Sequence, residues 1–380
     1  MILQIVFWGS LLMVAYPLIL YPLLVALIGL VITRPVRRAP LRARVTVLIP
    51  AFNEEAVIEA TIRNKLEQDY SRELLEIIVV SDASSDRTDE IVGSFAAQGV
   101  RLLRNADRAG KAEGLNRAVR EAGGEILIFS DANSMFAPDA ISRLVENFAD
   151  PQVGYVTGSL GFLSADGLAG GGVDAYIRYE NLVRRVETRV HSIIGVNGGV
   201  DAIRRSLYRD VPRDQITDFV LPLSVLMRGS RVVFDCRAQA REEANRDLAP
   251  EFSMRVRVAL RAMRGLCHVS DLLKPWRYPW SSFCIWSHKV LRYGAYLFMV
   301  AALASNVVLA FRGHFYLVLL ALHLMFYAIA LGTIALGSAS WLPRILAVPA
   351  YLVTSNAAFA VASVRFLRGE SMATWRPRAG

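Results

Sequence analysis

The sequence predicts an α/β domain built on a mostly parallel sheet, with transmembrane helices before and after it. Three observations support this fold class. The apolar fraction of 54% over 380 residues is high for a soluble protein. Apolar residues gather at 1–33 and 294–366, whereas the stretch from about 40 to 275 has ordinary globular composition. Inside that stretch, β-branched runs alternate with polar segments of helical character, which is typical of a sheet covered by helices on both faces.

The N-terminal segment 1–33 has no charged side chain and is long enough to cross a bilayer. It lacks the basic start of a signal peptide, so we expect a retained transmembrane helix that is kinked at Pro17 and Pro22. Arginines follow the segment at once, and no charged side chain precedes it. The positive-inside rule therefore predicts that the middle of the chain is cytoplasmic, at an inner or plasma membrane. These arginines are Arg34, Arg37, Arg38, Arg42 and Arg44.

Three more spans fit the C-terminal region, at about 291–311, 315–337 and 344–364. Three spans after one anchor would put the C-terminus outside, but arginines near the end, such as Arg365 and Arg376, favour the inside. One of the segments would then be re-entrant or interfacial. The predicted divisions are a transmembrane helix at 1–33, a globular domain at 40–245, amphipathic or interfacial helices at 246–290, about three transmembrane helices at 291–366 and a tail at 367–380.

The net charge of +9 comes mostly from arginine and allows either nucleic acid or an anionic membrane surface as a partner. The hydrophobic segments favour the membrane, and we expect no nucleic acid. The three cysteines, Cys236, Cys267 and Cys284, are scattered and form no CxxC pair. The sequence therefore predicts neither a zinc site nor a disulfide framework, in keeping with a reducing cytoplasm.

Four strands are predicted in the first part of the globular domain, each followed by a helical segment. Ligands on parallel sheets bind beyond the carboxyl ends of the strands. We therefore expect a shared site from the polar residues that follow these ends, at 53–54, 82, 108–111 and 131–133. The strands are 45–50, 75–81, 100–104 and 125–130, and the helices are about 54–68, a segment from Ser85 or Asp86, about 110–122 and a segment with Pro138 in its first turn.

The second part of the domain is less regular. We expect a strand at 153–162, a glycine-rich loop that continues as a helix over 168–190, a strand-like stretch with three glycines at 193–205, a helix at 216–229 ended by Gly229 and a closing strand at 230–243. A basic amphipathic helix at 251–266 is then expected on the membrane surface, before Trp- and Pro-rich residues at the bilayer interface. His288, Lys289 and Arg292 are interpreted as interfacial anchors, and His323 as a neutral side chain packed between helices.

Four charged residues near the predicted sheet edge are candidates for chemistry, and a structural role is the alternative for most of them. Asp82 can accept hydrogen bonds from a nucleobase or ribose, or it can be a turn residue. Asp131 can bind a divalent metal that bridges a diphosphate. Lys111 at a helix start suits phosphate, although a solvated lysine has the same pattern. Asp218 can be a general base or a helix cap, with Asp214 as a rival.

Six short motifs occur in a collinear order that is more specific than any of them alone. With this set, the chain resembles the family 2 glycosyltransferases of the GT-A fold over about 43–245. Its flanking helices resemble those of the membrane-bound branch, which includes cellulose, chitin and hyaluronan synthase-like enzymes. The motifs are "PAFNE" (50–54), "SDASSDRT" (81–88), "GKAEGLNRA" (110–118), "SDANS" (130–134), "VNGG" (196–199) and "TDFVLPL" (217–223).

The resemblance implies a Rossmann-like GT-A domain whose first motifs bind the donor. Asp82 would contact the uracil or other base of a nucleotide-sugar. Ala51, Asn53 and Glu54 would line the base and ribose, and Lys111 would lie near the base or the phosphates.

The later motifs would hold the reacting groups. The resemblance implies that Asp131 binds the donor diphosphate and the metal, Mg²⁺ or Mn²⁺. Asn197, Gly198 and Gly199 would form a close-approach loop at the donor sugar and the acceptor. Asp218, in the position of the family's Glu-Asp pair, would deprotonate the acceptor hydroxyl.

The chain departs from the family pattern at three places. Asn133 replaces the second carboxylate of the metal motif, and Thr217 stands where the family has a glutamate before the base. The Gln-x-x-Arg-Trp motif of processive synthases is absent from "RVRVALRAMRGL" (255–266). Arg257 and Arg261 in that segment could meet the diphosphate, or they could face lipid.

The leading hypothesis is an inverting glycosyltransferase that moves a sugar from a nucleotide-sugar, a UDP-sugar by preference, to a lipid or glycan acceptor at the cytoplasmic face. The absent Gln-x-x-Arg-Trp motif favours single transfer over the alternative of processive polysaccharide synthesis with export. A catalytically degenerate, nucleotide-binding membrane subunit is a second alternative, which Asn133 favours. A nucleotidyltransferase would need a glycine-rich basic loop after the first strand, where "PAFNEE" is acidic.

Overall fold

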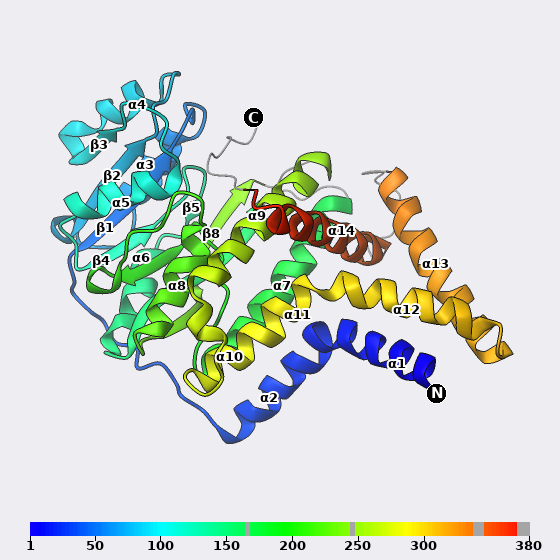
Figure 1. Ribbon diagram of the computed structural model, residues 1–380. Coiled ribbons are helices and arrows are strands. Elements are labelled where there is room, and N and C mark those ends of the chain that lie inside the picture. Colours follow the sequence, from blue (N-terminus) through cyan, green and yellow to red (C-terminus); the bar gives the residue numbers. More distant parts are fainter. Residues whose placement is uncertain (164–167, 244–247, 337–345, 371–380) are drawn as a thin grey trace.

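The computed structural model describes residues 1–163, 168–243, 248–336 and 346–370. In this part of the chain, eight strands form one mixed sheet in the order β3-β2-β1-β4-β7-β6-β8-β5 (Figure 1). The pairs β1–β2, β1–β4, β2–β3 and β6–β8 are parallel, and β4–β7, β6–β7 and β5–β8 are antiparallel. The strands are β1 Val45–Ala51, β2 Leu75–Ser81, β3 Val100–Arg104, β4 Ile126–Phe129, β5 Met135–Phe136, β6 Val153–Leu163, β7 Asp201–Arg204 and β8 Arg231–Glu243.

Two hydrophobic cores cover the two faces of this sheet, because successive strand side chains point to opposite sides. Leu48 and Ile78 join the core that contains side chains of α5, α7 and α8. Val47 and Ile77, one residue earlier in the same strands, join the core that contains side chains of α3, α4 and α6. The predicted α/β fold with helices on both faces is therefore confirmed. The helices are α3 Ile58–Leu66, α4 Thr88–Ser94, α5 Lys111–Glu121, α6 Ala140–Glu146, α7 Leu168–Val190 and α8 Thr217–Met227.

The predicted strands β2 and β3 have the expected ends, whereas three predicted helix starts were wrong. Helix α4 begins at Thr88, whose amide donates a hydrogen bond of 3.0 Å to the side chain of Asp86, so Asp86 lies before the helix. Helix α6 begins at Ala140, so Pro138 precedes it. The glycine-rich residues from 168 are helical rather than a loop. Glycine in a helix costs only roughly 1 kcal/mol per residue, which other interactions can offset.

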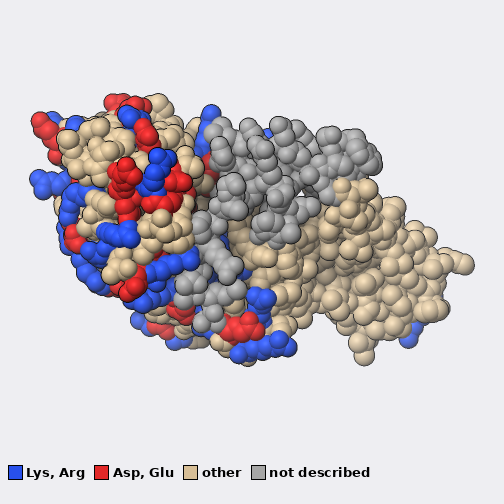
Figure 2. All heavy atoms as spheres, turned by 90° about the horizontal axis from the view of Figure 1, so that it is seen from above, with Lys and Arg blue, Asp and Glu red and all other residues tan. Residues whose placement is uncertain are grey.

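The apolar helices extend away from the charged domain (Figures 1 and 2). Among the described residues, three helices are long and apolar enough to cross a membrane: Ile2–Val31, His314–Leu336 and Val348–Leu367. Pro279–Tyr293 and Ala295–Ala310 form a fourth candidate, bent by 56° at the break between them. This bent pair is the candidate for the expected re-entrant segment. The elements are α1 Ile2–Ala15, η1 Tyr16–Leu20, α2 Tyr21–Val31, α10 Pro279–Ile285, η7 Trp286–Val290, α11 Leu291–Tyr293, α12 Ala295–Ala310, α13 His314–Leu336 and α14 Ala347–Leu367.

The N-terminal helix is also packed into the globular domain. Tyr21 and Val25 of α2 are fully buried in the same core as the sheet residue Leu48. The Tyr21 hydroxyl donates a hydrogen bond of 2.5 Å to Glu187 of α7. The π-helical turn η1 precedes α2 and contains Pro17, where the sequence predicts a kink.

Helix α9, Leu248–His268, is the predicted basic amphipathic helix. Its buried side chains Val256 and Leu260 pack against Ala358 and Ala362 of α14, so this apolar face meets protein. The expectation that this helix lies on the membrane surface stays a prediction. The predicted tail beyond 370 and the beginnings of the predicted segments at 246 and 344 lie outside the described residues.

Candidate active site

The carboxyl end of β2 carries Asp82, whose carboxylate binds the loop before α5. It accepts hydrogen bonds from the Asn105 side chain (3.0 Å) and from the backbone amides of Ala109 (2.7 Å) and Gly110 (2.8 Å). Gly110 is the N-cap of α5, with a φ of 89° that glycine adopts readily. Asp82 therefore holds the backbone that carries Lys111 into the site.

The residues after β1 form the neighbouring loop at the same edge of the sheet. Asn53 has a φ of 54°, and its side-chain oxygen accepts a hydrogen bond of 2.8 Å from the Ser85 amide. The Glu54 amide donates a hydrogen bond of 2.8 Å to Thr88. The Arg108 guanidinium lies 3.9 Å from the centroid of the Phe52 ring, a cation–π contact that joins this loop to the one held by Asp82. Ala51 is buried at the end of β1.

Lys111, the first residue of α5, brings the charged groups of the site together. Its ammonium lies 2.5 Å from Asp131 Oδ1 and 3.9 Å from Asp218 Oδ2. Burial alone would lower the pKa of Lys111, but the charges of Asp131 and Asp218 outweigh burial and place this pKa above its ordinary value. Three residues from α5, the end of β4 and the start of α8 thus converge, as the motifs predict.

The glycines of the predicted close-approach loop lie against these carboxylates. Gly198 and Gly199 both have a φ of 71°, in the left-handed region. A Cβ on Gly198 would lie 2.6 Å from Asp218 Oδ2, and one on Gly199 would lie 2.8 Å from Ser134 Oγ and 3.7 Å from Asp131 Oδ2. Only glycine fits here without displacing a carboxylate or distorting the loop.

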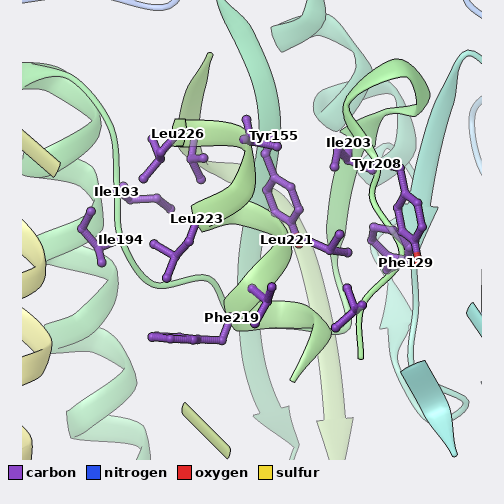
Figure 3. Close-up of a cluster of buried hydrophobic side chains, with 14 of the residues drawn as sticks. Phe129, Tyr155, Ile193, Ile194, Ile203, Tyr208, Phe219, Leu221, Leu223 and Leu226 are labelled. Atoms are coloured by element: carbon purple, nitrogen blue, oxygen red, sulfur yellow. The ribbon is translucent and has the colours of Figure 1, made fainter. Parts of the chain in front are cut away.

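Helix α8 holds Asp218 through its hydrophobic side chains. Phe219, Leu221, Leu223 and Leu226 are buried beside Tyr155 and other core residues (Figure 3). Asp218 precedes them in the first turn of the helix, where it is half-buried and the helix dipole favours an anion. Thr217 donates a hydrogen bond of 3.0 Å to Asp218 Oδ1.

Asp214, the alternative candidate for the general base, is hydrogen-bonded to a different residue. Its Oδ2 accepts a hydrogen bond of 3.2 Å from Arg264 of α9. Arg261 of α9 donates to the Gln215 carbonyl, and the charges of Arg257 and Asp218 both act on Arg261. The start of α8 and the Arg257–Arg261 face of α9 therefore meet beside the site.

A second layer supports the turn that carries Asp131. The buried Lys65 donates a hydrogen bond of 2.5 Å to the Ser134 carbonyl and lies 3.8 Å from the centroid of the Phe136 ring. Burial lowers the pKa of Lys65 well below its ordinary value. The Ser134 hydroxyl donates to the buried Glu242 of β8. Sequence reasoning missed these residues, because Glu242 is more than a hundred residues from Ser134 and no local pattern links them.

Asp201, the first residue of β7, is a buried carboxyl group that sequence reasoning also missed. It is 0% exposed, and neither oxygen has a hydrogen bond of good geometry among the described residues, although Thr157 and Tyr155 supply the nearest hydroxyls. Burial, followed by the charge of Asp218, raises the pKa of Asp201 to about 7. An acidic residue inside the apolar run "VDAI" was the available signal.

Asn197, at the other end of the glycine loop, is held by α7. The Arg184 guanidinium donates to the Asn197 side-chain oxygen and, at 2.9 Å, to the Gly195 carbonyl. The Asn197 side-chain nitrogen donates a hydrogen bond of 2.6 Å to the Gly158 carbonyl. All three predicted loop residues therefore lie in one ordered loop beside Asp218.

A divalent cation fits this site only with oxygen atoms from a ligand. The described residues contain no group of three or more His, Cys, Asp or Glu side chains that could hold a metal. Asp131 is 37% exposed at its side chain, and Asn133 is half-buried with no hydrogen bond from its amide among the described residues. One carboxylate and one amide oxygen suit Mg²⁺ or Mn²⁺ that also binds phosphate oxygens.

Known proteins share both the motifs and the fold. Residues 46–211 match the family model described as glycosyl transferase family 2. This segment of the chain is similar to glycosyltransferase family 2. A poly-β-1,6-N-acetyl-D-glucosamine synthase of Staphylococcus aureus is 28% identical to this chain over 200 residues, which cover 50% of this chain and 48% of the relative. An uncharacterised protein of Mycobacterium tuberculosis is 29% identical over 189 residues, covering 50% and 54%. The match thus spans about half the length of these curated relatives.

The chain also resembles a solved structure along nearly its whole length. A mannosyltransferase from Pyrobaculum calidifontis, in complex with GDP-Man and Mn²⁺, superposes with a TM-score of 0.77 over 97% of this chain and 99% of that chain. The two sequences are 24% identical, so this likeness concerns the fold. The predicted GT-A fold is confirmed by it.

Proposed function

We propose that this chain is a membrane-bound, inverting glycosyltransferase that moves a sugar from a nucleotide-sugar to a lipid or glycan acceptor at the cytoplasmic face. The observation that carries the proposal is the position of Lys111 between Asp131 and Asp218, with Gly198 against Asp218. One cation, one exposed diphosphate ligand and one carboxylate at a helix start are the groups that such a transfer needs.

The donor occupies the strand ends in this proposal. The base and ribose lie by Ala51, Asn53, Glu54 and the loop held by Asp82, and the diphosphate lies by Lys111. Asp131, with Asn133 beside it, would hold Mg²⁺ or Mn²⁺ together with the diphosphate. The cation supplies positive charge to the leaving group when it is bound. A UDP-sugar is the first donor to test, and GDP-mannose is the second, because the structural neighbour was solved with GDP-Man.

Transfer then proceeds with inversion at the anomeric carbon. Asp218 accepts the proton of the acceptor hydroxyl as its oxygen forms the new bond to that carbon, and the bond to the diphosphate breaks. Lys111 stabilises the negative charge that develops on the departing nucleoside diphosphate. The Asn197–Gly199 loop allows the sugar to approach Asp218 because its glycines have no side chain. Arg257 and Arg261 add positive charge on the α9 side of the site.

Processive polysaccharide synthesis with export is a second candidate, which the similarity to the Staphylococcus aureus polysaccharide synthase favours. The apolar helices could line a path for a polymer, whereas the Gln-x-x-Arg-Trp motif is absent from α9. The length of the product decides between the two candidates. A single added sugar supports the first proposal, and a polymer series supports the second.

The proposal is tested with the full chain in lipid nanodiscs, a panel of nucleotide-sugars and either Mg²⁺ or Mn²⁺. Release of nucleoside diphosphate from one donor, dependent on the cation and abolished by Asp218→Asn, is the expected result. If nucleotide-sugars bind but no donor is hydrolysed or transferred, the proposed enzymatic function is overturned. The result would then support a catalytically degenerate, nucleotide-binding membrane subunit.

A further inference from the structure

Lys289 of the π-helical turn η7 contacts the loop whose Gly198 lies against Asp218. A Cβ on Gly195 would lie 2.7 Å from Lys289 Nζ and 3.1 Å from Cε, so the ammonium lies directly against this backbone. The same loop continues through Asn197 to Gly198, which touches Asp218. Lys289 is half-buried and lies five residues before Gly294, where the bent pair α10–α12 breaks. The ammonium therefore stands between the apolar helices and the candidate base.

The ammonium of Lys289 has no partner among the described residues. No hydrogen bond and no ion pair within 4.0 Å joins it to any of them, whereas the nearby His288 and Arg292 are each paired with a carboxylate. His288 Nδ1 lies 3.0 Å from Glu187 Oε1, and His288 Nε2 lies 3.3 Å from Glu180 Oε2. Lys289 thus differs from His288, its neighbour on the same turn, which is buried and paired. The sequence led us to interpret both residues as interfacial anchors.

The carboxylates and guanidinium groups near Lys289 are equal in number, so its ammonium adds one positive charge to them. Glu180 pairs with Arg292 at 2.5 Å and lies 3.9 Å from Arg184. Glu187 accepts hydrogen bonds from Tyr21 and His288. The two carboxylates thus equal the two guanidinium groups in number before Lys289 is counted, although both guanidinium groups pair with Glu180 and one oxygen of Glu187 has no hydrogen bond among the described residues. A half-buried ammonium without a counterion is costly, and an anion from outside the chain would remove that cost.

The backbone around Lys289 is held on two sides. Tyr16 of η1 and Ser287 of η7 share a hydrogen bond of 2.9 Å, so the two π-helical turns lie against each other. The Trp280 indole donates a hydrogen bond of 3.2 Å to the carbonyl of Ser192, just before the loop. Single π-helical turns often occur at functional sites. Here the turn presents its lysine at a fixed place over Gly195.

We propose that Lys289 binds a phosphate group of the acceptor, and so selects an acceptor that carries phosphate near the hydroxyl to be glycosylated. This inference rests on the proposed transferase function, because it assigns the acceptor of that site. A phosphate offers three oxygens to an ammonium, and lysine binds it as a point charge. The phosphate can belong to a lipid or to a water-soluble molecule.

The test uses the full chain in phosphatidylcholine nanodiscs and measures the thermal midpoint of unfolding. The probes are phosphatidic acid in the disc, the same amount of diacylglycerol in the disc, and glycerol 3-phosphate in the buffer. A ligand that binds only the folded protein raises the midpoint. We expect phosphatidic acid, glycerol 3-phosphate or both to raise it, and diacylglycerol to leave it unchanged. A response to phosphatidic acid alone assigns a lipid phosphate, and an equal response to glycerol 3-phosphate assigns a soluble one.

Three variants locate the effect. Lys289→Met removes the charge and should weaken the phosphate affinity by about tenfold, as expected for one charge-assisted contact. Lys289→Arg keeps the charge and should keep most of the response. Lys274→Met is the matched control, because Lys274 is exposed and paired with Asp271 on the same segment. Equal responses to phosphatidic acid and diacylglycerol in the wild type, or an unchanged phosphate response in Lys289→Met, would overturn the proposal.

A separate arm keeps this proposal distinct from the proposed function. A nucleotide-sugar with Mn²⁺ should raise the midpoint of the wild type and of Lys289→Met alike, because Lys289 lies against Gly195, whereas the predicted diphosphate ligands are Lys111 and Asp131 on other elements. Failure of every donor to do so in the wild type counts against the transferase, whereas the phosphate probes decide the role of Lys289. Loss of donor stabilisation in Lys289→Met alone would show that the variant disturbs the fold, and would count against a specific phosphate contact.

Discussion

Lys111 and Asp131 form an ion pair at the carboxyl ends of the parallel strands, with 2.5 Å between Nζ and Oδ1. Asp218 lies on the other side of the same ammonium, at 3.9 Å. One cation is thus shared by the group expected to bind the diphosphate and the group expected to remove the acceptor proton. An incoming diphosphate would compete with Asp131 for this ammonium, and a divalent cation would then satisfy the carboxylate.

The shared cation gives the first prediction. Lys111→Met should weaken binding of the nucleoside diphosphate by about tenfold or more, because the loss of a charged hydrogen-bond donor costs roughly 1.5–3 kcal/mol. Calorimetric titration of the nucleotide into nanodisc-embedded protein measures this. Lys111→Arg should retain much of the affinity. An unchanged dissociation constant in Lys111→Met would remove Lys111 from the donor site.

The second prediction separates two neighbouring carboxylates. Asp218→Asn should bind donor normally and lower the rate of transfer by about 100-fold or more, the usual effect of losing a general base. Asp214→Asn is the matched control, because Asp214 binds Arg264 instead of the site. Its turnover should stay within a few-fold of the wild type. A larger loss in Asp214→Asn than in Asp218→Asn would reverse the assignment.

The third prediction compares two glycines that share a left-handed backbone conformation. Gly198 and Gly229 have φ values of 71° and 77°, so alanine should cost roughly 1–2 kcal/mol of stability at either position. A Cβ at 198 would lie 2.6 Å from Asp218 Oδ2, whereas one at 229 has nothing within 4 Å. Gly198→Ala should therefore lose turnover and Gly229→Ala should keep it. Equal turnover at matched temperature below both unfolding midpoints would contradict contact between the loop and the base.

The fourth prediction concerns the amide that replaces a carboxylate. Asn133→Asp adds a negative charge beside Asp131 and should lower the concentration of Mn²⁺ needed for half-maximal donor binding, because hard cations prefer carboxylates. Titration of Mn²⁺ at fixed nucleotide measures it. Asn133→Ala should raise the required concentration or leave it unchanged. A higher requirement in Asn133→Asp would show that Asn133 does not face the cation.

The fifth prediction follows from the buried Asp201. Its pKa of about 7 in the folded protein exceeds the ordinary value of 3.8, so between these two pH values the folded state holds a proton that the unfolded state has released. The stabilisation is present at acidic pH and is lost as the pH rises to about 7, by at most about 1.4 kcal/mol per pH unit. Relative to the wild type, Asp201→Asn should therefore gain stability as the pH rises from 5 to about 7. Unfolding midpoints that differ by the same amount at both pH values would refute it.

Motifs and strand ends could be predicted because they depend on local sequence. The apolar residues of β2 and β3 identify the ends of these strands, and parallel strands bring Asp82, Lys111 and Asp131 to one edge without knowledge of any contact. The partners of buried polar groups could not be predicted. Lys65 and Glu242 support the Asp131 turn from distant elements, and periodicity reports that a side chain is buried without reporting what it meets.

Charged residues near the apolar helices were the least predictable. His288 and Arg292 have the sequence pattern of interfacial anchors, yet they are bound to carboxylates of α7 more than a hundred residues away. Likewise, the arginines of α9 resemble a lipid-facing row in sequence, but Arg264 and Arg261 bind protein groups. Long-range ion pairs of this kind depend on tertiary packing, which one sequence does not reveal.

The buried hydroxyl of Tyr21 means that the globular domain cannot be separated from the N-terminal helix without loss of core contacts. Removal of residues 1–33 to obtain a water-soluble fragment would take away the donor to Glu187 and the partner of Ser287, and would open the core around Val25. The disturbance would pass along α7 to Arg184 and the loop at Asn197. Absence of activity in a protein that lacks residues 1–33 would therefore not count against the proposed transferase function. Activity assays require a protein that retains the first helix.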